Sequence, residues 1–181
     1  MKSLLSSWQA VAIAGLSLLL TIGTASFAQA PNRPPPAPPS EISLAEARVI
    51  IEGAIAFARD ANLRMSVVVL DQAANMVTSA RMDGAGAQNA HFAEGKAYAS
   101  AIFRQTTQAL GEIAKSRPDR YFGIMNMYPG KVYLVGGGAP LELDGQFFGA
   151  VGVAGLPEGV DEKAGRAGIA AWSKFRETMK K

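Results

Sequence analysis

The spacing of apolar residues predicts a helix followed by two strands at the start of the folded region. Ser43 to Glu46 has the sequence of a capping box, and apolar side chains then recur at helical spacing, at Leu44, Ala47, Ile51, Ala54 and Ala58. The helix is expected to end near Asn62, because asparagine tolerates the left-handed conformation that closes many helices. Two short apolar runs, at residues 65–70 and 76–82, predict strands joined by a turn.

Helical spacing returns in the middle of the chain. Asn89 is expected to cap a helix that runs to about Phe103. Small residues recur along one face of that helix, at Ala90, Ala93, Ala97 and Ala101, so the face could pack closely on a sheet or on a second helix. Thr106 is expected to cap a short helix to about Ala114. Residues 116–130 are expected to form an irregular loop, because prolines and glycines interrupt a sequence rich in large apolar residues.

Residues 131–155 carry the strongest strand signals of the chain. An apolar run at 132–135 predicts one strand, and two extended segments flank Asp144-Gly145. An Asp-Gly pair in this position favours a type I′ hairpin, because both central residues need positive φ. Glycines at 136–138 and along the second arm, 146–154, do not have the spacing of a phosphate-binding loop. Two hypotheses for them stay open: close packing, or a flat surface for a ligand or a second subunit.

A last helix is predicted after Pro157. Its apolar stripe consists of Ala164, Gly168, Ala171, Trp172, Phe175 and Met179. Asp161 and Glu162 suit the positive N-terminal end of this helix. The resulting order is helix, two strands, two helices, three strands and helix. With such tight turns, this order predicts an α+β domain in which helices pack on an antiparallel sheet.

The first 42 residues differ in composition from the rest of the chain. Residues 1–28 combine an early Lys2, an apolar run at 11–22 and small residues before Gln29, which predicts a cleaved secretory signal peptide. An uncleaved membrane anchor is the alternative. Residues 29–42 predict an extended linker because of their many prolines. The folded domain is therefore expected at residues 43–181, in the periplasm or outside the cell, without a stable membrane span after cleavage.

Composition excludes several classes of site. The chain has 181 residues and a formal net charge of +3, which is too small to indicate nucleic-acid binding. It contains no cysteine, which excludes disulfides, iron–sulfur clusters, cysteine nucleophiles and thiolate-bound zinc. His91 is the single histidine, so one subunit cannot form a site with several histidines.

An ordered set of short motifs resembles a known family. The motifs are VVVLD at 67–71, RMDGAGAQ at 81–88, GKAYAS at 95–100, Thr107, GGGAPL at 136–141, the segment DGQFFGAVGVAG ending at Gly155, and Asp161-Glu162. Together they resemble the GlcG/HbpS family of haem-binding and haem-utilisation proteins, and the related C-terminal domain of PduO-type adenosyltransferases. The resemblance covers residues 43–171. It implies a five-stranded antiparallel sheet flanked by helices, a homo-oligomer, and haem binding by exported members.

The same resemblance suggests residues for a haem site. His91 has the chemistry of an axial iron ligand, and Tyr98 shares its helix face. Tyr121, Met125 and Met127 are other possible ligands. Thr107 and Lys96 match family positions, and Arg81 and Arg104 could pair with haem propionates. Each also has a structural alternative, such as packing, capping or surface solvation.

Three functions compete on this basis. The leading hypothesis is an exported haem-binding protein for storage, transport or sensing. The second is an enzyme of the same fold that acts on a small molecule or degrades haem, although the sequence shows no nucleophile–base pair. The third is an oligomeric interaction module without a cofactor.

Overall fold

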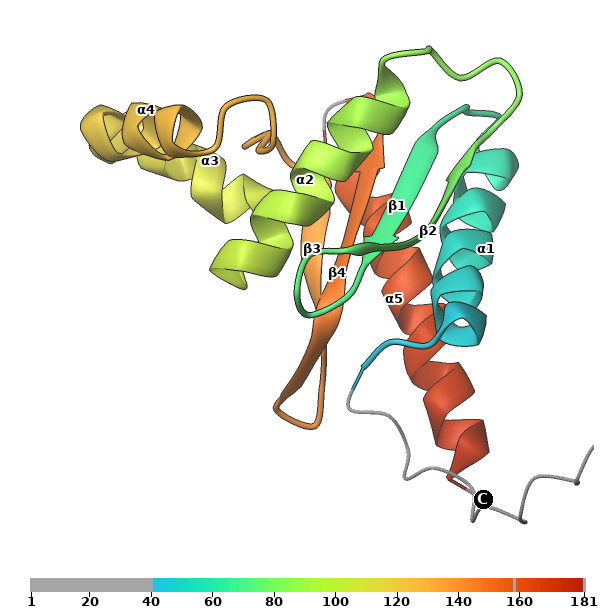
Figure 1. The fold of residues 1–181 in the computed structure, drawn as a ribbon. Coiled ribbons are helices and arrows are strands. Elements are labelled where there is room, and N and C mark those ends of the chain that lie inside the picture. Colours follow the sequence, from blue (N-terminus) through green and yellow to red (C-terminus); the bar gives the residue numbers. More distant parts are fainter. Residues whose placement is uncertain (1–40, 158, 181) are drawn as a thin grey trace, which may run out of the picture. The chain divides into compact units, whose positions relative to one another are not determined.

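The capping box begins the first helix, as predicted. The computed structural model describes residues 41–157 and 159–180, shown in Figure 1. Ser43 caps α1 (Leu44–Asp60): its Oγ accepts a hydrogen bond from the Glu46 N–H, and the Glu46 side chain accepts one from the Ser43 N–H. Asn62 closes the helix with a φ of 54°. The predicted signal peptide and nearly all of the predicted linker lie outside the described residues.

The strands form one antiparallel sheet in the order β2-β1-β4-β3. They are β1 (Ser66–Leu70), β2 (Met76–Arg81), β3 (Gly138–Leu143) and β4 (Gln146–Ala154). Asp144 and Gly145 join β3 to β4 with φ values of 52° and 76°. Both values are positive, which confirms the predicted hairpin.

The described residues contain four strands, so the prediction of five is wrong for this part of the chain. The missing strand is the apolar run at 132–135. The N–H of Tyr133 donates to the Gly95 carbonyl, which lies in the helix Asn89–Phe103, at 3.1 Å. Val132 and Leu134 are buried in a cluster with Ala99 and Leu110. The run therefore packs against helices instead of pairing with a strand.

Three helices lie between β2 and β3. They are α2 (Asn89–Phe103), α3 (Thr107–Ser116) and α4 (Pro118–Met127). Gln88, not Asn89, is the N-cap of α2. Thr106 caps α3 as predicted, since its Oγ1 accepts from the Ala109 N–H at 3.2 Å.

The predicted loop at 116–130 is mostly helical, because neither of its prolines interrupts a helix: Pro129 follows the end of α4 at Met127. Pro118 is in the first turn of α4, where a missing N–H costs no hydrogen bond. Asp119 in the same turn forms an ion pair with Arg117, with 3.5 Å between Asp119 Oδ1 and Arg117 Nε. Several apolar side chains of α4 pack against the cluster around Leu110.

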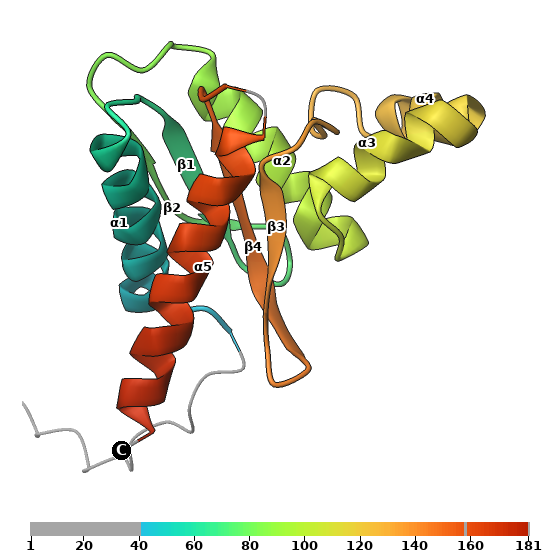
Figure 2. The ribbon, with the colours of Figure 1, turned by 180° about the vertical axis from the view of Figure 1, so that it is seen from behind.

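Helices cover both faces of the sheet. Figures 1 and 2 show α1 and α5 (Val160–Met179) on one face and α2 on the other, with α3 and α4 extending to the side. The core between α1, α5 and the sheet includes Ile50, Met65, Val151 and Trp172. Two residues of the predicted apolar stripes are exposed instead of buried. Leu44, at the start of α1, is 45% exposed, and Met179, at the end of α5, is 73% exposed.

The glycine-rich strand allows α2 to lie directly on the sheet. A Cβ added to Gly152 would lie 2.0 Å from the Ala93 carbonyl oxygen and 2.5 Å from the Ala97 nitrogen. Ala93 and Ala97 are fully buried there. The close-packing hypothesis is therefore correct at Gly152, and this small-residue face of α2 is used within the subunit.

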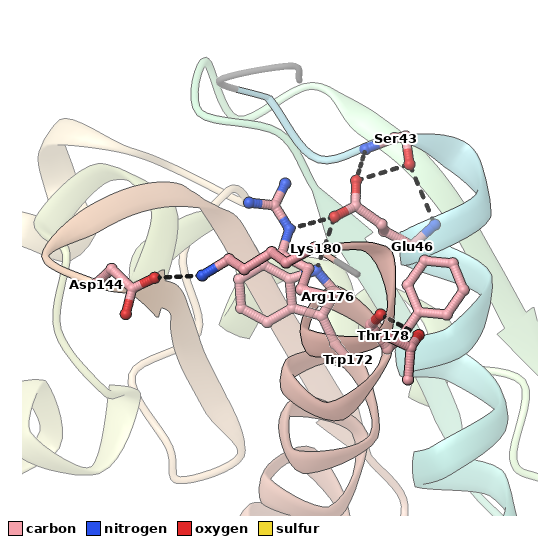
Figure 3. Close-up of polar contacts among 8 residues, drawn as sticks. Ser43, Glu46, Asp144, Trp172, Arg176, Thr178 and Lys180 are labelled. Atoms are coloured by element: carbon pink, nitrogen blue, oxygen red, sulfur yellow. Dashed lines mark hydrogen bonds and ion pairs between the residues drawn. The ribbon is translucent and has the colours of Figure 1, made fainter. Parts of the chain in front are cut away.

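A polar network joins α1 to α5 (Figure 3). Glu46 accepts hydrogen bonds from Trp172 Nε1 at 3.2 Å and from Arg176 Nε. The Arg176 guanidinium lies 3.8 Å from the centre of the Phe148 ring. Burial alone raises the pKa of Glu46, but hydrogen bonds from Arg176, Ser43 and Trp172 outweigh it and lower that pKa from 4.5 to about 2.

No helix within residues 41–157 and 159–180 combines the length and the apolar character that crossing a membrane requires.

Candidate functional site

A cavity of about 780 Å³ lies where α2, α3 and α5 meet the end of β4 and the segment at 133–136. Its volume is within the range of about 300–1,000 Å³ that small-molecule sites occupy. The N-terminal parts of α3 and α5 both contribute to its lining. We call it the α2–α5 cavity.

A buried ion pair lies at this cavity. Lys96 of α2 is 2% exposed, and its Nζ lies 2.6 Å from Asp161 Oδ2 of α5. The ammonium also donates to the Val153 carbonyl at 2.9 Å, and the Leu156 N–H donates to Asp161 Oδ1 at 2.9 Å. Burial raises the pKa of Asp161 above its ordinary value, and the neighbouring Lys96 ammonium opposes that rise. Buried charges are retained in a fold only with such partners.

The three consecutive glycines at 136–138, the glycine run, leave space for the Lys96–Asp161 ion pair. A Cβ on Gly137 would lie 2.9 Å from Lys96 Nζ and 2.7 Å from the Asp161 Cβ. Gly137 also has a φ of 125°, a conformation that other residues rarely adopt. At least one glycine of this run therefore serves the cavity, in addition to strand packing.

A second carboxylate is held at the cavity wall. Glu162 lies in the first turn of α5, and the Gln108 amide nitrogen, in the orientation that satisfies both groups, donates to its two oxygens at 2.8 and 3.0 Å. Glu162 Oε2 also lies 3.6 Å from Nη1 of Arg166. A Cβ on Gly136 would lie 2.3 Å from Glu162 Oε1, so the carboxylate lies directly over that glycine.

Two aromatic rings form another part of the wall. Phe92 of α2 stacks on Tyr133, with 4.7 Å between ring centroids and 20° between ring planes. The Lys96 ammonium lies 5.8 Å from the centre of the Tyr133 ring. The cavity thus combines an aromatic surface with oriented charged groups.

Of the nine candidate residues named from the sequence, Lys96 and Thr107 meet at this cavity. Thr107 is fully buried, and its Oγ1 accepts a hydrogen bond from the Gly138 N–H at 2.8 Å. It therefore fixes the glycine run beside the cavity.

The other seven candidates lie elsewhere: Tyr121 and Met125 pack against the cluster around Leu110, and Met127 is exposed. Arg81 lines a second hollow of about 390 Å³ and donates to the Ala85 carbonyl at 2.9 Å. The ring of Tyr98 packs edge-on against that of Tyr128, and the Arg104 guanidinium lies 4.8 Å from the centre of the Phe147 ring. His91 is exposed on α2 and does not line either of these two cavities.

Sequence reasoning did not identify Asp161, Glu162 and Gln108 as parts of one site. Asp161 and Glu162 were assigned to the favourable N-terminal end of a helix, which is correct for α5 but incomplete. One signal could have identified this site: Lys96 and Asp161-Glu162 both belong to the motifs that carry the family resemblance.

The comparisons with known proteins identify the family. A protein-family model described as haem degrading protein HbpS-like matches residues 42–170. An uncharacterized 15.0 kDa protein of Citrobacter freundii is 30% identical over 114 residues, which cover 63% of this chain and 80% of that protein.

Solved structures share the fold. A double mutant of Streptomyces reticuli HbpS is 29% identical with a TM-score of 0.66, covering 74% of this chain and 88% of that chain. Klebsiella pneumoniae ORFY has a TM-score of 0.69 at 23% identity, with coverage of 77% and 96%. A PduOC structure solved as a haem complex has a TM-score of 0.67 at 23% identity, with coverage of 72% and 94%. The chain therefore belongs to the HbpS-like family, whose description relates it to haem.

Proposed function

We propose that this chain is an exported haem-binding protein and that the His91 imidazole binds the iron. The observation that carries the proposal is the family match over residues 42–170, which includes His91 and the whole described sheet. The haem complex of PduOC, a protein of the same fold, is consistent with it.

The chemistry of His91 suits an iron ligand. Imidazole is a common protein ligand of haem iron. The side chain is exposed and, within the described residues, makes no hydrogen bond or ion pair. Haem bound there would supply a redox-active iron, while the protein would contribute the imidazole and the surrounding surface.

The α2–α5 cavity is a poorer match for the haem propionates. Glu112, Asp161 and Glu162 line it, and its one lining cation, Lys96, is already paired. Anionic propionates would be repelled by the carboxylates of Glu112 and Glu162, because their ion-pair partners Lys115 and Arg166 are largely exposed and offset these charges only weakly. We therefore place the proposed iron site on the exposed side of α2 and not in this cavity.

Hemin titration distinguishes binding from catalysis. Saturable growth of a Soret band on adding hemin to purified protein supports a binding protein. Loss of the porphyrin spectrum with turnover, in the presence of a reductant, would instead favour the haem-degrading activity that the family description names. Without any saturable spectral change, the proposal fails.

Export and self-association belong to the same proposal. N-terminal sequencing of protein recovered outside the cytoplasm should begin near Gln29, whereas an intact Met1 in the cytoplasmic fraction would contradict export.

Self-association is supported by α4, on which Phe122 is 62% and Met127 is 75% exposed. Exposed apolar side chains of this kind often mark contacts between subunits.

A further inference from the structure

The charge balance of the α2–α5 cavity favours a cationic ligand. Four charged residues line it: Lys96, Glu112, Asp161 and Glu162. Lys96 and Asp161 neutralise each other at 2.6 Å, which leaves the carboxylates of Glu112 and Glu162. Glu112 pairs with Lys115, but both side chains are more than half exposed, and such surface pairs are weak and exchangeable.

Glu162 is oriented before any ligand arrives. Its side chain is 14% exposed, and the Gln108 amide holds both of its oxygens. Its ion pair with Arg166 is long at 3.6 Å, and Arg166 is 64% exposed. A carboxylate fixed in this way can accept a charge-assisted hydrogen bond without first losing side-chain entropy.

The aromatic wall adds a second preference. The faces of Phe and Tyr rings attract cations and stack against other rings. Phe92 is 39% exposed beside the cavity, so its stack with Tyr133 is not sealed inside the core. A bare metal ion is a poor alternative, because the described residues contain no group of three His, Asp or Glu side chains suited to a metal.

We propose that the α2–α5 cavity binds a small aromatic amine, with its ammonium at Glu162 and its ring against Phe92 and Tyr133. This ligand class is opposite in charge to the propionates of haem. The proposal therefore does not depend on the haem-binding proposal, and either can fail without the other.

Three probes that share one ring but differ in charge test it: benzylamine, benzyl alcohol and benzoate. Each is titrated into the purified protein up to about 10 mM, where ligands of this size bind. Binding is followed by amide chemical shifts. Benzylamine is expected to bind at least about tenfold more tightly than benzyl alcohol, with benzoate the weakest. The largest shifts should map to residues around Gly136 and Glu162.

Substitutions at the carboxylate complete the test. Glu162→Gln keeps the side-chain shape and is expected to weaken benzylamine binding about tenfold, with little effect on benzyl alcohol. Glu177→Gln, on the exposed surface of the same helix, is the control and should bind like the wild type. Phe92→Leu should weaken benzylamine and benzyl alcohol alike.

Four results would overturn the proposal, and the first three concern affinity. They are no saturable benzylamine binding, benzoate binding as tight as benzylamine binding, or an unchanged benzylamine affinity in Glu162→Gln. Shifts confined to residues away from the cavity would also refute it.

Discussion

At the scale of single residues, Glu46 shows how a partner distant in sequence changes the chemistry of a side chain. The capping box at Ser43 could be predicted from four consecutive residues, and the structure confirms it. The hydrogen bonds from Trp172 and Arg176 span more than 120 positions and have no local signal. The same holds for Lys96 and Asp161, which lie 65 positions apart. The sequence therefore predicted the caps at Ser43 and Thr106 but not the composition of the cavity.

Glu46→Gln is expected to destabilise the fold by about 1–2 kcal/mol at pH 7. The substitution removes the charged hydrogen-bond acceptor of Trp172 and Arg176, and solvent partly screens that charge. The lowered pKa of Glu46 means that its ionised form favours the folded state. Its contribution should be full above pH 4.5 and disappear as the pH falls from 4.5 towards 2. Urea unfolding at a series of pH values measures this. The wild type and Glu46→Gln should converge in acid, and a constant difference at all pH values would contradict the assignment.

At the scale of elements, the hairpin was predicted correctly from local sequence, whereas the run at 132–135 and the helix α4 were not. The Asp144-Gly145 hairpin needed only its own backbone, and it is present as predicted. The run at 132–135 has strand composition, yet α2 and α3 offer it a buried position outside the sheet. The helix α4 was missed because proline and glycine suggested a loop, although Pro118 occupies a first-turn position.

Gly152→Ala tests the close contact between α2 and β4. The added methyl would meet backbone atoms of Ala93 and Ala97, which cannot move without shifting the helix. We expect a loss of about 2 kcal/mol or more in unfolding free energy. Gly123→Ala in α4 is the control, because its Cβ would meet no atom within 4 Å. That control should be neutral or stabilising by up to about 1 kcal/mol. Equal stability of the two variants would contradict the packing account.

At the scale of the whole molecule, we expect the subunits to associate. The small-residue face of α2 and Gly152 are already used inside the subunit, so we place the contact on the exposed apolar residues of α4, Phe122 and Met127. Light scattering at micromolar concentration should give a mass well above that of one chain, which is 19.0 kDa for all 181 residues. Replacing Phe122 and Met127 by serine should lower it. A monomer mass for the unmodified protein would contradict this expectation.

We propose that this chain binds haem through His91, and a paired hemin titration of the wild type and His91→Ala is the decisive measurement. The wild type should show a saturable Soret band. In His91→Ala the maximum should shift and the affinity should fall at least about tenfold, roughly 1.4 kcal/mol, because an iron–imidazole bond is lost. Because His91 is exposed, the substitution should leave the fold intact, which circular dichroism can verify. An unchanged spectrum and affinity in His91→Ala would contradict the assignment of the ligand, and no saturable band in the wild type would contradict haem binding itself.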